Sequence, residues 1–165
     1  MARPLESVPN FSEGRDRATI DALAEALESR ARLLDVHSDE DHNRSVFTLV
    51  GSEEELLEAL LAAVACARER IDLRRHEGAH PRIGVADVVP IVPLVPEDLG
   101  RARATALELA ERVAVSSACR YFSTASLQAS AGPRSSAPVV SGSCAGGWRA
   151  ERSRRTTAPG GWTRA

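Results

Sequence analysis

The sequence predicts an α+β fold in which helices cover one face of a single sheet. Short alternating or apolar runs, typical of strands, occur between longer segments whose apolar residues recur with helical spacing. Polar connections rich in turn-forming residues separate these runs. The chain has 165 residues, 43% of them hydrophobic, which is enough to bury the core of one domain of ordinary size.

The first two elements are a short strand and a helix. Residues 5–14 (LESVPNFSEG) begin with a strand pattern and end in a loop. Ser12 and Gly14 then precede a helix. The apolar residues of this helix fall on one face at Ile20, Leu23 and Leu27.

A hairpin is expected next. Residues 32–38 (RLLDVHS) and 44–51 (RSVFTLVG) both have strand patterns. The polar residues 39–43 (DEDHN) connect them, and Gly51 closes the second strand. These two strands and the first one account for the early part of the sheet.

A long helix, a buried strand and a last helix follow. Residues 52–71 open with Ser52 and Glu55 at capping-box spacing and carry an apolar stripe, which runs through Leu56, Leu60, Val64 and Ala67. Residues 85–95 (VADVVPIVPLV) read as a buried strand, and residues 96–114 as a helix. The strand contains Pro90 and Pro93, which predict a sheet edge or a bulge. The order β-α-β-β-α-β-α is that of a split βαβ, ferredoxin-like layer with the helices on one face of the sheet.

The composition changes near residue 115. Residues 1–115 have a formal net charge of about −8 and residues 116–165 one of about +6. The second segment has no helical or alternating period, so we expect a tail from 116 to 165 that is disordered or read out of frame. A basic tail can also be a nucleic-acid arm, but its arginines are scattered and no groove-reading motif accompanies them, so no nucleic-acid partner is expected.

Neither a membrane segment nor a disulfide framework is expected. The first residues lack a basic segment followed by an apolar run, which predicts a cytoplasmic protein without a signal peptide. The cysteines are odd in number and have no CxxC spacing, at Cys66, Cys119 and Cys144. They are therefore expected to be buried or idle thiols.

The stretch HEGAHPRIG, residues 76–84, contains His-Glu-x-x-His, which on a helix would place His76 and His80 on one face to bind zinc. However, Gly78 lies between the histidines and Pro81 follows His80 directly, which disfavours a helix there. The other two histidines both lie upstream, at His37 and His42. We therefore expect no metal, and instead a loop between the long helix and the apolar strand.

Three segments carry a resemblance to a known family. Residues 8–15 (VPNFSEGR), 33–51 (LLDVHSDEDHNRSVFTLVG) and 71–94 (IDLRRHEGAHPRIGVADVVPIVPL) closely resemble the N-terminal subdomain of the glutamate formimidoyltransferase (formiminotransferase) family, in the same order and at the same separations. The resemblance covers about residues 5–114. It implies a one-carbon transferase that moves the formimidoyl group of N-formimidoyl-L-glutamate to N5 of tetrahydrofolate, in histidine degradation. Formyl transfer stays open as an alternative.

The resemblance also assigns site residues. The family's catalytic histidine lies in Gly-x-His-Pro-Arg, which places the role on His80, since imidazole titrates near working pH and can serve as base and then acid. Arg44 and Arg82 suit the carboxylates of the glutamate or the folate tail. Asn10 and Asn43 suit neutral polar groups. Tetrahydrofolate is thereby implied as the acceptor substrate, with no metal.

Other interpretations of these residues stay open. Asn10 can simply form a turn, and Asn43 and Arg44 can cap the hairpin connection through side-chain to backbone bonds. His76 is a weak candidate, because a surface histidine at a helix end would complement the helix dipole. His37 is another weak candidate, although the chain departs there from the animal enzymes of the family, which have an acidic residue at this position.

The resemblance stops near residue 115, so we expect the family subdomain over 1–115 and a non-family tail over 116–165. Synonymous codons for Val115 to Ser126, read from their third base, give Glu-Leu-Gly-Val-Pro-Val-Phe-Leu-Tyr-Gly-Glu, which resembles the family's continuation. The C-terminal subdomain of the family is missing from this chain. We therefore expect impaired activity or, as the alternative, a non-catalytic folded module for binding or dimerisation. A homodimer, and a second chain that supplies the missing subdomain, both stay open.

Overall fold

The structure is a computed structural model that describes residues 3–79, 84–117, 120–123 and 139–143. Its elements alternate between strands and helices as the sequence predicts. In chain order they are β1 (Leu5–Ser7), β2 (Asn10–Phe11), α1 (Arg17–Glu28), β3 (Arg32–Asp39), β4 (Arg44–Gly51), α2 (Glu53–Arg70), β5 (Ala86–Pro93), the 3₁₀ helix η1 (Pro96–Asp98), α3 (Leu99–Ser117), β6 (Arg120–Ser123) and β7 (Val139–Ser143).

All strand pairings of the described sheet are antiparallel. β1 and β2 lie end to end between β4 and β5, and β3 pairs with the other edge of β4. The carbonyl of Pro9, between β1 and β2, accepts a hydrogen bond from the Phe47 amide at 3.0 Å. β1 and β2 therefore act as one interrupted strand, which gives the predicted βαββαβα order. The α+β, ferredoxin-like layer is confirmed.

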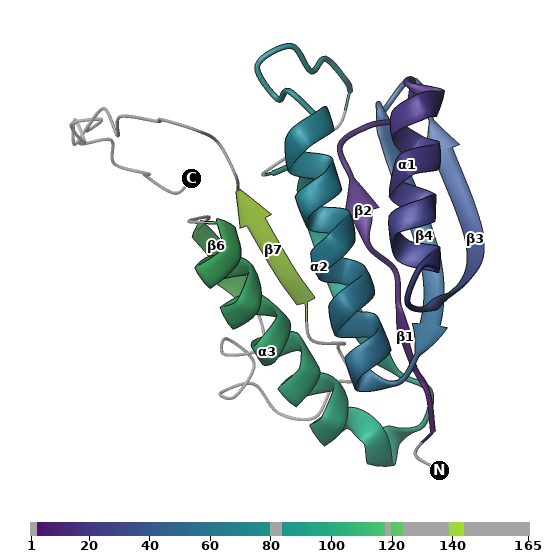
Figure 1. Ribbon diagram of the computed structural model, residues 1–165, viewed down its shortest axis with the longest axis vertical. Coiled ribbons are helices and arrows are strands. Elements are labelled where there is room, and N and C mark those ends of the chain that lie inside the picture. The colour runs from purple at the N-terminus through teal and green to yellow at the C-terminus, as the bar shows by residue number, and fades with distance from the viewer. Residues whose placement is uncertain (1–2, 80–83, 118–119, 124–138, 144–165) are drawn as a thin grey trace, which may run out of the picture.

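The three helices pack on one face of the sheet (Figure 1). Every second residue of β4 is buried, and Phe47 and Leu49 are fully buried. The rings of Phe11 and Phe47 meet edge to face with centroids 5.6 Å apart, a favoured aromatic geometry. The apolar helix positions expected from the sequence are all buried, at Ile20, Leu23, Leu27, Leu56, Leu60, Val64 and Ala67. Because side chains alternate along a strand, Val46 and Thr48 lie on the face away from this core.

The predicted capping box of α2 is present. The Ser52 amide donates to the Glu55 carboxylate at 2.7 Å, and the Glu55 amide donates to the Ser52 hydroxyl at 3.4 Å. The bond from the Ser52 amide, together with one from the Ser52 hydroxyl to the Glu55 carboxylate at 2.9 Å, lowers the pKa of Glu55. Acidic residues in the first turn and arginines in the last turn complement the helix dipole. The first residue of this helix could therefore be predicted from the sequence.

The prolines of β5 do not mark a sheet edge. β5 pairs with β1 and β2 on one side and with β7 on the other. The β7 pairing involves only Val89 and Pro90, and Pro93 is the last residue of the strand. Because so few ladder bonds are at stake, the missing proline N–H groups are tolerated inside the sheet. The edge alternative was therefore wrong, whereas the pairing of β5 with β2 does contain a bulge-type shift of register, since Asn10 pairs with Val88 and Phe11 with Ala86.

Two stretches beyond residue 115 are strands, β6 and β7, within the segment for which the sequence predicted a tail that is disordered or read out of frame. β7 adds to β5, and β6 pairs with β7. Strand addition uses the unpaired backbone groups of an edge, which a side-chain pattern does not reveal. α3 also extends to Ser117, and residues 118–119, 124–138 and 144–165 of the expected tail lie outside the described residues. Within the described part of the chain, no helix is long and apolar enough to cross a membrane.

Candidate functional site

Three loops meet at one end of the sheet (Figure 1). Residues 12–16 follow β2, residues 40–43 connect β3 to β4, and residues 71–79 follow α2. Each of the three segments that carry the family resemblance contributes one of these loops. The fold thus brings together loops that are far apart in the sequence.

Asn43 connects all three loops. Its carboxamide oxygen accepts a hydrogen bond from the Gly14 amide at 2.9 Å, and its carboxamide nitrogen donates to the Glu77 carbonyl at 3.0 Å. Asn43 is only 7% exposed and has a left-handed backbone conformation with φ of 49°. The sequence suggested that Asn43 either contacts substrate or caps its own hairpin connection. In the structure both ends of the carboxamide instead bind the two other loops.

Two glycines allow the loops to approach each other. A Cβ atom on Gly14 would lie 2.2 Å from the Asp39 carbonyl oxygen and 2.4 Å from the Arg44 amide nitrogen. A Cβ atom on Gly78 would lie 2.5 Å from the His42 carbonyl oxygen. These are backbone atoms that have little room to move, so only glycine fits at both places. The sequence did not single out either glycine as part of the site.

The residues before the proposed catalytic histidine are fixed to the hairpin connection. His76 Nε2 lies 2.9 Å from the Asn43 carbonyl oxygen, which requires the proton of that bond to be on Nε2. The Ala79 amide donates to the Asp41 carbonyl at 3.2 Å. His76 to Ala79 form a loop, which confirms the prediction that this stretch is not helical.

The predicted site residues His80 and Arg82 lie outside the described residues, which stop at Ala79 and resume at Gly84. Gly84 is anchored as firmly as Ala79. Its carbonyl accepts a hydrogen bond from the Ser12 hydroxyl at 2.8 Å, and the Ser12 amide donates to the Val85 carbonyl at 2.9 Å. Both ends of the segment that contains His80 are therefore held at the same end of the sheet.

Asn10 and His37 lie on the face of the sheet away from the helices. Asn10 pairs with Val46 and with Val88, and Val46 pairs with His37 on its other side. Directly opposed side chains share a face, so these residues form a row in which Asn10 and His37 are two strand spacings, about 10 Å, apart. The carboxamide nitrogen of Asn10 donates to the Val8 carbonyl at 2.9 Å, the local bond expected if it shapes a turn.

Arg44 lies beside a carboxylate that the sequence analysis did not single out. Its Nη2 is 3.7 Å from Oδ2 of Asp87, and the two side chains are 22% and 8% exposed. Asp87 is an acidic residue within the apolar run of β5, and that exception to the pattern was the signal that could have identified it. The sequence placed Arg44 against substrate carboxylates, whereas this contact is with the protein's own carboxylate.

Asp39 and His42 form a second pair that was not predicted. His42 Nδ1 lies 2.8 Å from Asp39 Oδ2, and the His42 amide donates to Asp39 Oδ1 at 2.9 Å. Hydrogen bonds from the His42 backbone and then from its side chain lower the pKa of Asp39, so this carboxylate stays ionised at neutral pH. Within the described residues, no group of three histidine, cysteine or acidic side chains is arranged to hold a metal ion.

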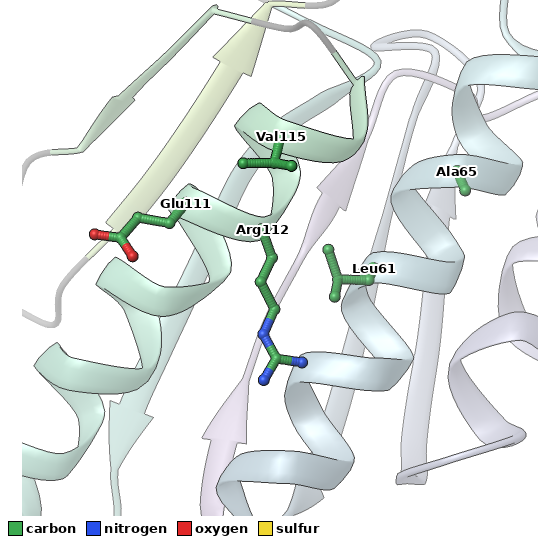
Figure 2. A pocket seen from close by; sticks show the side chains of 5 residues that line it. All are labelled: Leu61, Ala65, Glu111, Arg112 and Val115. Atoms are coloured by element: carbon green, nitrogen blue, oxygen red, sulfur yellow. The ribbon is translucent and has the colours of Figure 1, made fainter.

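A groove elsewhere on the surface contains none of these residues. It lies between α2 and α3 and has a volume of about 500 Å³ (Figure 2). Its lining consists of Leu61, Ala65, Glu111, Arg112 and Val115. The groove is therefore distinct from the end of the sheet where the three loops meet.

The chain is thus an α+β subdomain in which three polar loops meet at one end of the sheet. A family model described as the N-terminal subdomain of the formiminotransferase domain matches residues 4–136. The chain belongs to that family, and the resemblance stated from the sequence is confirmed. The match runs past residue 115, while the predicted domain boundary there stays a prediction.

The curated relatives carry transferase names. A glutamate formimidoyltransferase of Streptococcus pyogenes serotype M1 is 49% identical over 96 residues, which are 57% of this chain and 32% of that protein. One from Thermoplasma acidophilum is 42% identical over 111 residues, 66% of this chain and 37% of that protein. A formimidoyltransferase-cyclodeaminase of Gallus gallus is 45% identical over 97 residues, 58% of this chain and 18% of that protein. The chain spans about a third of the length of the first two relatives.

Proposed function

We propose that this chain is the N-terminal part of a glutamate formimidoyltransferase, which transfers the formimidoyl group of N-formimidoyl-L-glutamate to N5 of tetrahydrofolate in the cytoplasm. The family and the names of the relatives support transfer of a formimidoyl group. The observation that carries the proposal is that Ala79 and Gly84, on either side of the segment containing His80, are both anchored where the three loops meet.

His80 is the proposed catalytic residue. N5 of tetrahydrofolate attacks the formimidoyl carbon, the bond from that carbon to the glutamate nitrogen breaks, and the formimidoyl group ends on N5. A proton has to leave N5 and another has to reach the departing nitrogen, so one imidazole that first accepts and then donates a proton balances the reaction. A neutral imidazole is available for this near pH 7.

The remaining predicted residues are proposed as binding groups. Arg44 and Arg82 are placed against carboxylates of the two substrates, and the pairing of Arg44 with Asp87 would then orient its guanidinium. Asn10 is proposed to face a neutral polar group from the face of the sheet that the helices leave open. His37, on the same face and exposed, is a weaker candidate.

A chimera tests this function. Residues 5–114 would replace the matching segment of the Streptococcus pyogenes enzyme, and formation of 5-formimidoyltetrahydrofolate would be followed. We expect turnover by the chimera and a loss of about 10²–10⁴-fold in the His80→Gln variant. A folded chimera without turnover would contradict the function, and an unaffected His80→Gln variant would contradict the role of His80. Supplying the N-formyl analogue in parallel distinguishes formyl from formimidoyl transfer.

The chain by itself is expected to turn over much more slowly than the chimera. The segment of this chain that matches the first two relatives makes up only about a third of their length, so it supplies fewer groups with which to enclose the substrates. We also propose that residues after about 115 are read out of frame. Sequencing the gene across the codons for Val113 to Ser126 tests this, because an intact frame that encodes Glu-Leu-Gly-Val-Pro-Val would show that the tail is an error, and a confirmed Val-Ser-Ser frame would show that it is made.

A second candidate function, a non-catalytic binding or dimerisation module, is favoured by the groove between α2 and α3. Val115 at this groove is 89% exposed, and Leu107 on the same helix is 45% exposed. Val115 lines the groove together with Leu61 and Ala65, and contiguous exposed apolar surface is typical of interaction sites. Light scattering after size-exclusion chromatography tests the dimerisation module, because a monodisperse monomer would rule it out.

A further inference from the structure

We propose that Asn43 is a positioning residue, which fixes the loop from His76 to Ala79 and thereby the position of Ala79, the residue directly before His80. The inference rests on the proposed function for the role of His80. It differs from the substrate-binding role that the sequence suggested for Asn43, because it assigns the carboxamide to the protein's own loops.

The hydrogen bonds of Asn43 require a carboxamide. One loop offers an amide N–H, from Gly14, and the other offers a carbonyl, from Glu77. A single side chain has to accept from the first and donate to the second, and only an amide does both with two atoms on one carbon. An aspartate would keep the acceptor for Gly14 but would place a carboxylate oxygen against the Glu77 carbonyl.

The backbone of Asn43 adds a second requirement. Its φ of 49° lies in the left-handed region, which asparagine and glycine enter most readily. Glutamine has the same functional group but disfavours this conformation and is longer by one methylene. Of the common residues, asparagine alone meets both requirements, and glycine meets only the backbone one.

Three successive residues of the hairpin connection are attached to the loop after α2. The Asp41 carbonyl accepts from the Ala79 amide, and the His42 carbonyl lies where a Cβ on Gly78 would be 2.5 Å away. The Asn43 side chain donates to the Glu77 carbonyl, and the backbone carbonyl of Asn43 accepts from His76 Nε2. The loop therefore runs alongside the connection up to the residue that immediately precedes His80. Removing the carboxamide would loosen its central attachment.

The matched variants are Asn43→Gly and Asn43→Asp in the full chain. Asn43→Gly keeps the left-handed backbone and removes the carboxamide, whereas Asn43→Asp keeps only the acceptor. Asp98→Asn serves as the control, because Asp98 binds Arg3 and Arg101 at residues outside the three loops. It lowers global stability without touching the contacts of Asn43.

Two measurements by NMR test the proposal, and neither needs enzymatic activity. Amide exchange of Gly14 and Ala79 is expected to rise about tenfold in Asn43→Gly beyond any rise in Asp98→Asn, as the loss of one buried hydrogen bond implies. In Asn43→Asp the Gly14 amide should stay protected while Ala79 exchanges faster. The imidazole titration of His80, assigned by its loss in His80→Gln, should shift its midpoint in both Asn43 variants and not in the control.

The outcomes separate the proposals. Unchanged exchange at Ala79, or faster exchange with an unaltered His80 titration, would overturn the positioning role. In the chimera, Asn43→Gly is expected to lower kcat about tenfold or more with little change in KM, because the Asn43 carboxamide is bonded to Gly14 and Glu77 of the protein itself. If His80→Gln retains full activity while the Asn43 variants still alter the His80 titration, the catalytic assignment fails and the positioning role stands.

Discussion

The carboxamide oxygen of Asn43 lies 2.9 Å from the Gly14 amide nitrogen, and this hydrogen bond joins loops whose residues are 29 apart in the chain. The bond is buried, and Gly14 lies so close to the backbone of Asp39 and Arg44 that a Cβ atom would not fit. It therefore depends on a side-chain amide at one residue and on the absence of any side chain at the other.

Gly14→Ala is expected to lower the free energy of unfolding by about 1–3 kcal/mol, as overpacking against rigid backbone does. The added methyl would lie 2.2 Å from the Asp39 carbonyl oxygen, so the loops must separate. The control is Gly100→Ala, because nothing lies within 4 Å of a Cβ at Gly100, within α3. There we expect a gain of up to about 1 kcal/mol from helix propensity. Urea unfolding followed by circular dichroism measures both; equal losses would contradict the steric argument.

Arg44 and Asp87 are expected to be energetically coupled. Their charged atoms are 3.7 Å apart and both side chains are largely buried, so removing either one takes an opposite charge away from the other in a poorly solvated place. A double-mutant cycle with Arg44→Met and Asp87→Asn should give a coupling energy of about 0.5–3 kcal/mol in urea unfolding. Additive effects of the two substitutions would show that the contact contributes nothing.

The ionisation of Asp72, just after the end of α2, is expected to make the free energy of unfolding depend on pH. Hydrogen bonds from the Arg74 side chain and backbone lower the pKa of Asp72 from 3.8 to about 2. Because the folded-state pKa is depressed, the stabilisation is complete above pH 4 and is lost as the pH falls from about 4 to about 2. The difference in urea midpoint between the parent and Asp72→Asn should therefore be constant above pH 5 and disappear near pH 2. A difference that persists unchanged at pH 2 would exclude this cause.

Asp98 holds together the N-terminal segment and α3. Its two oxygens accept from Arg3 at 3.2 Å and from Arg101 at 2.9 Å, and Asp98 is only 6% exposed. Asp98→Asn should lower the free energy of unfolding by about 1–3 kcal/mol, as the loss of charged hydrogen bonds at a buried site does. Glu108→Gln breaks an exposed ion pair with Arg112 and should change the free energy of unfolding by less than about 0.5 kcal/mol. Similar effects of the two substitutions would contradict the importance of burial.

The sequence by itself determined the elements whose signals are local. The apolar stripe and capping box of α2 involve residues within three or four positions of each other, so periodicity and spacing were enough to predict them. The alternation in β4 likewise fixed which residues face the core. Gly78 and Pro81 together predicted that the stretch from His76 is not helical, because their effects on the backbone are local.

Only the tertiary structure decided which distant groups meet. The partners of Asn43 are 29 and 34 residues away, and Arg44 meets Asp87 across the sheet. A hydrogen bond depends on distance and direction in space, which no periodicity along the chain encodes. For the same reason the two prolines of β5 wrongly suggested an edge, since the pairing with β7 uses backbone groups. The sequence thus named Asn43 as a site residue, and the fold determined that its bonds are made to Gly14 and Glu77.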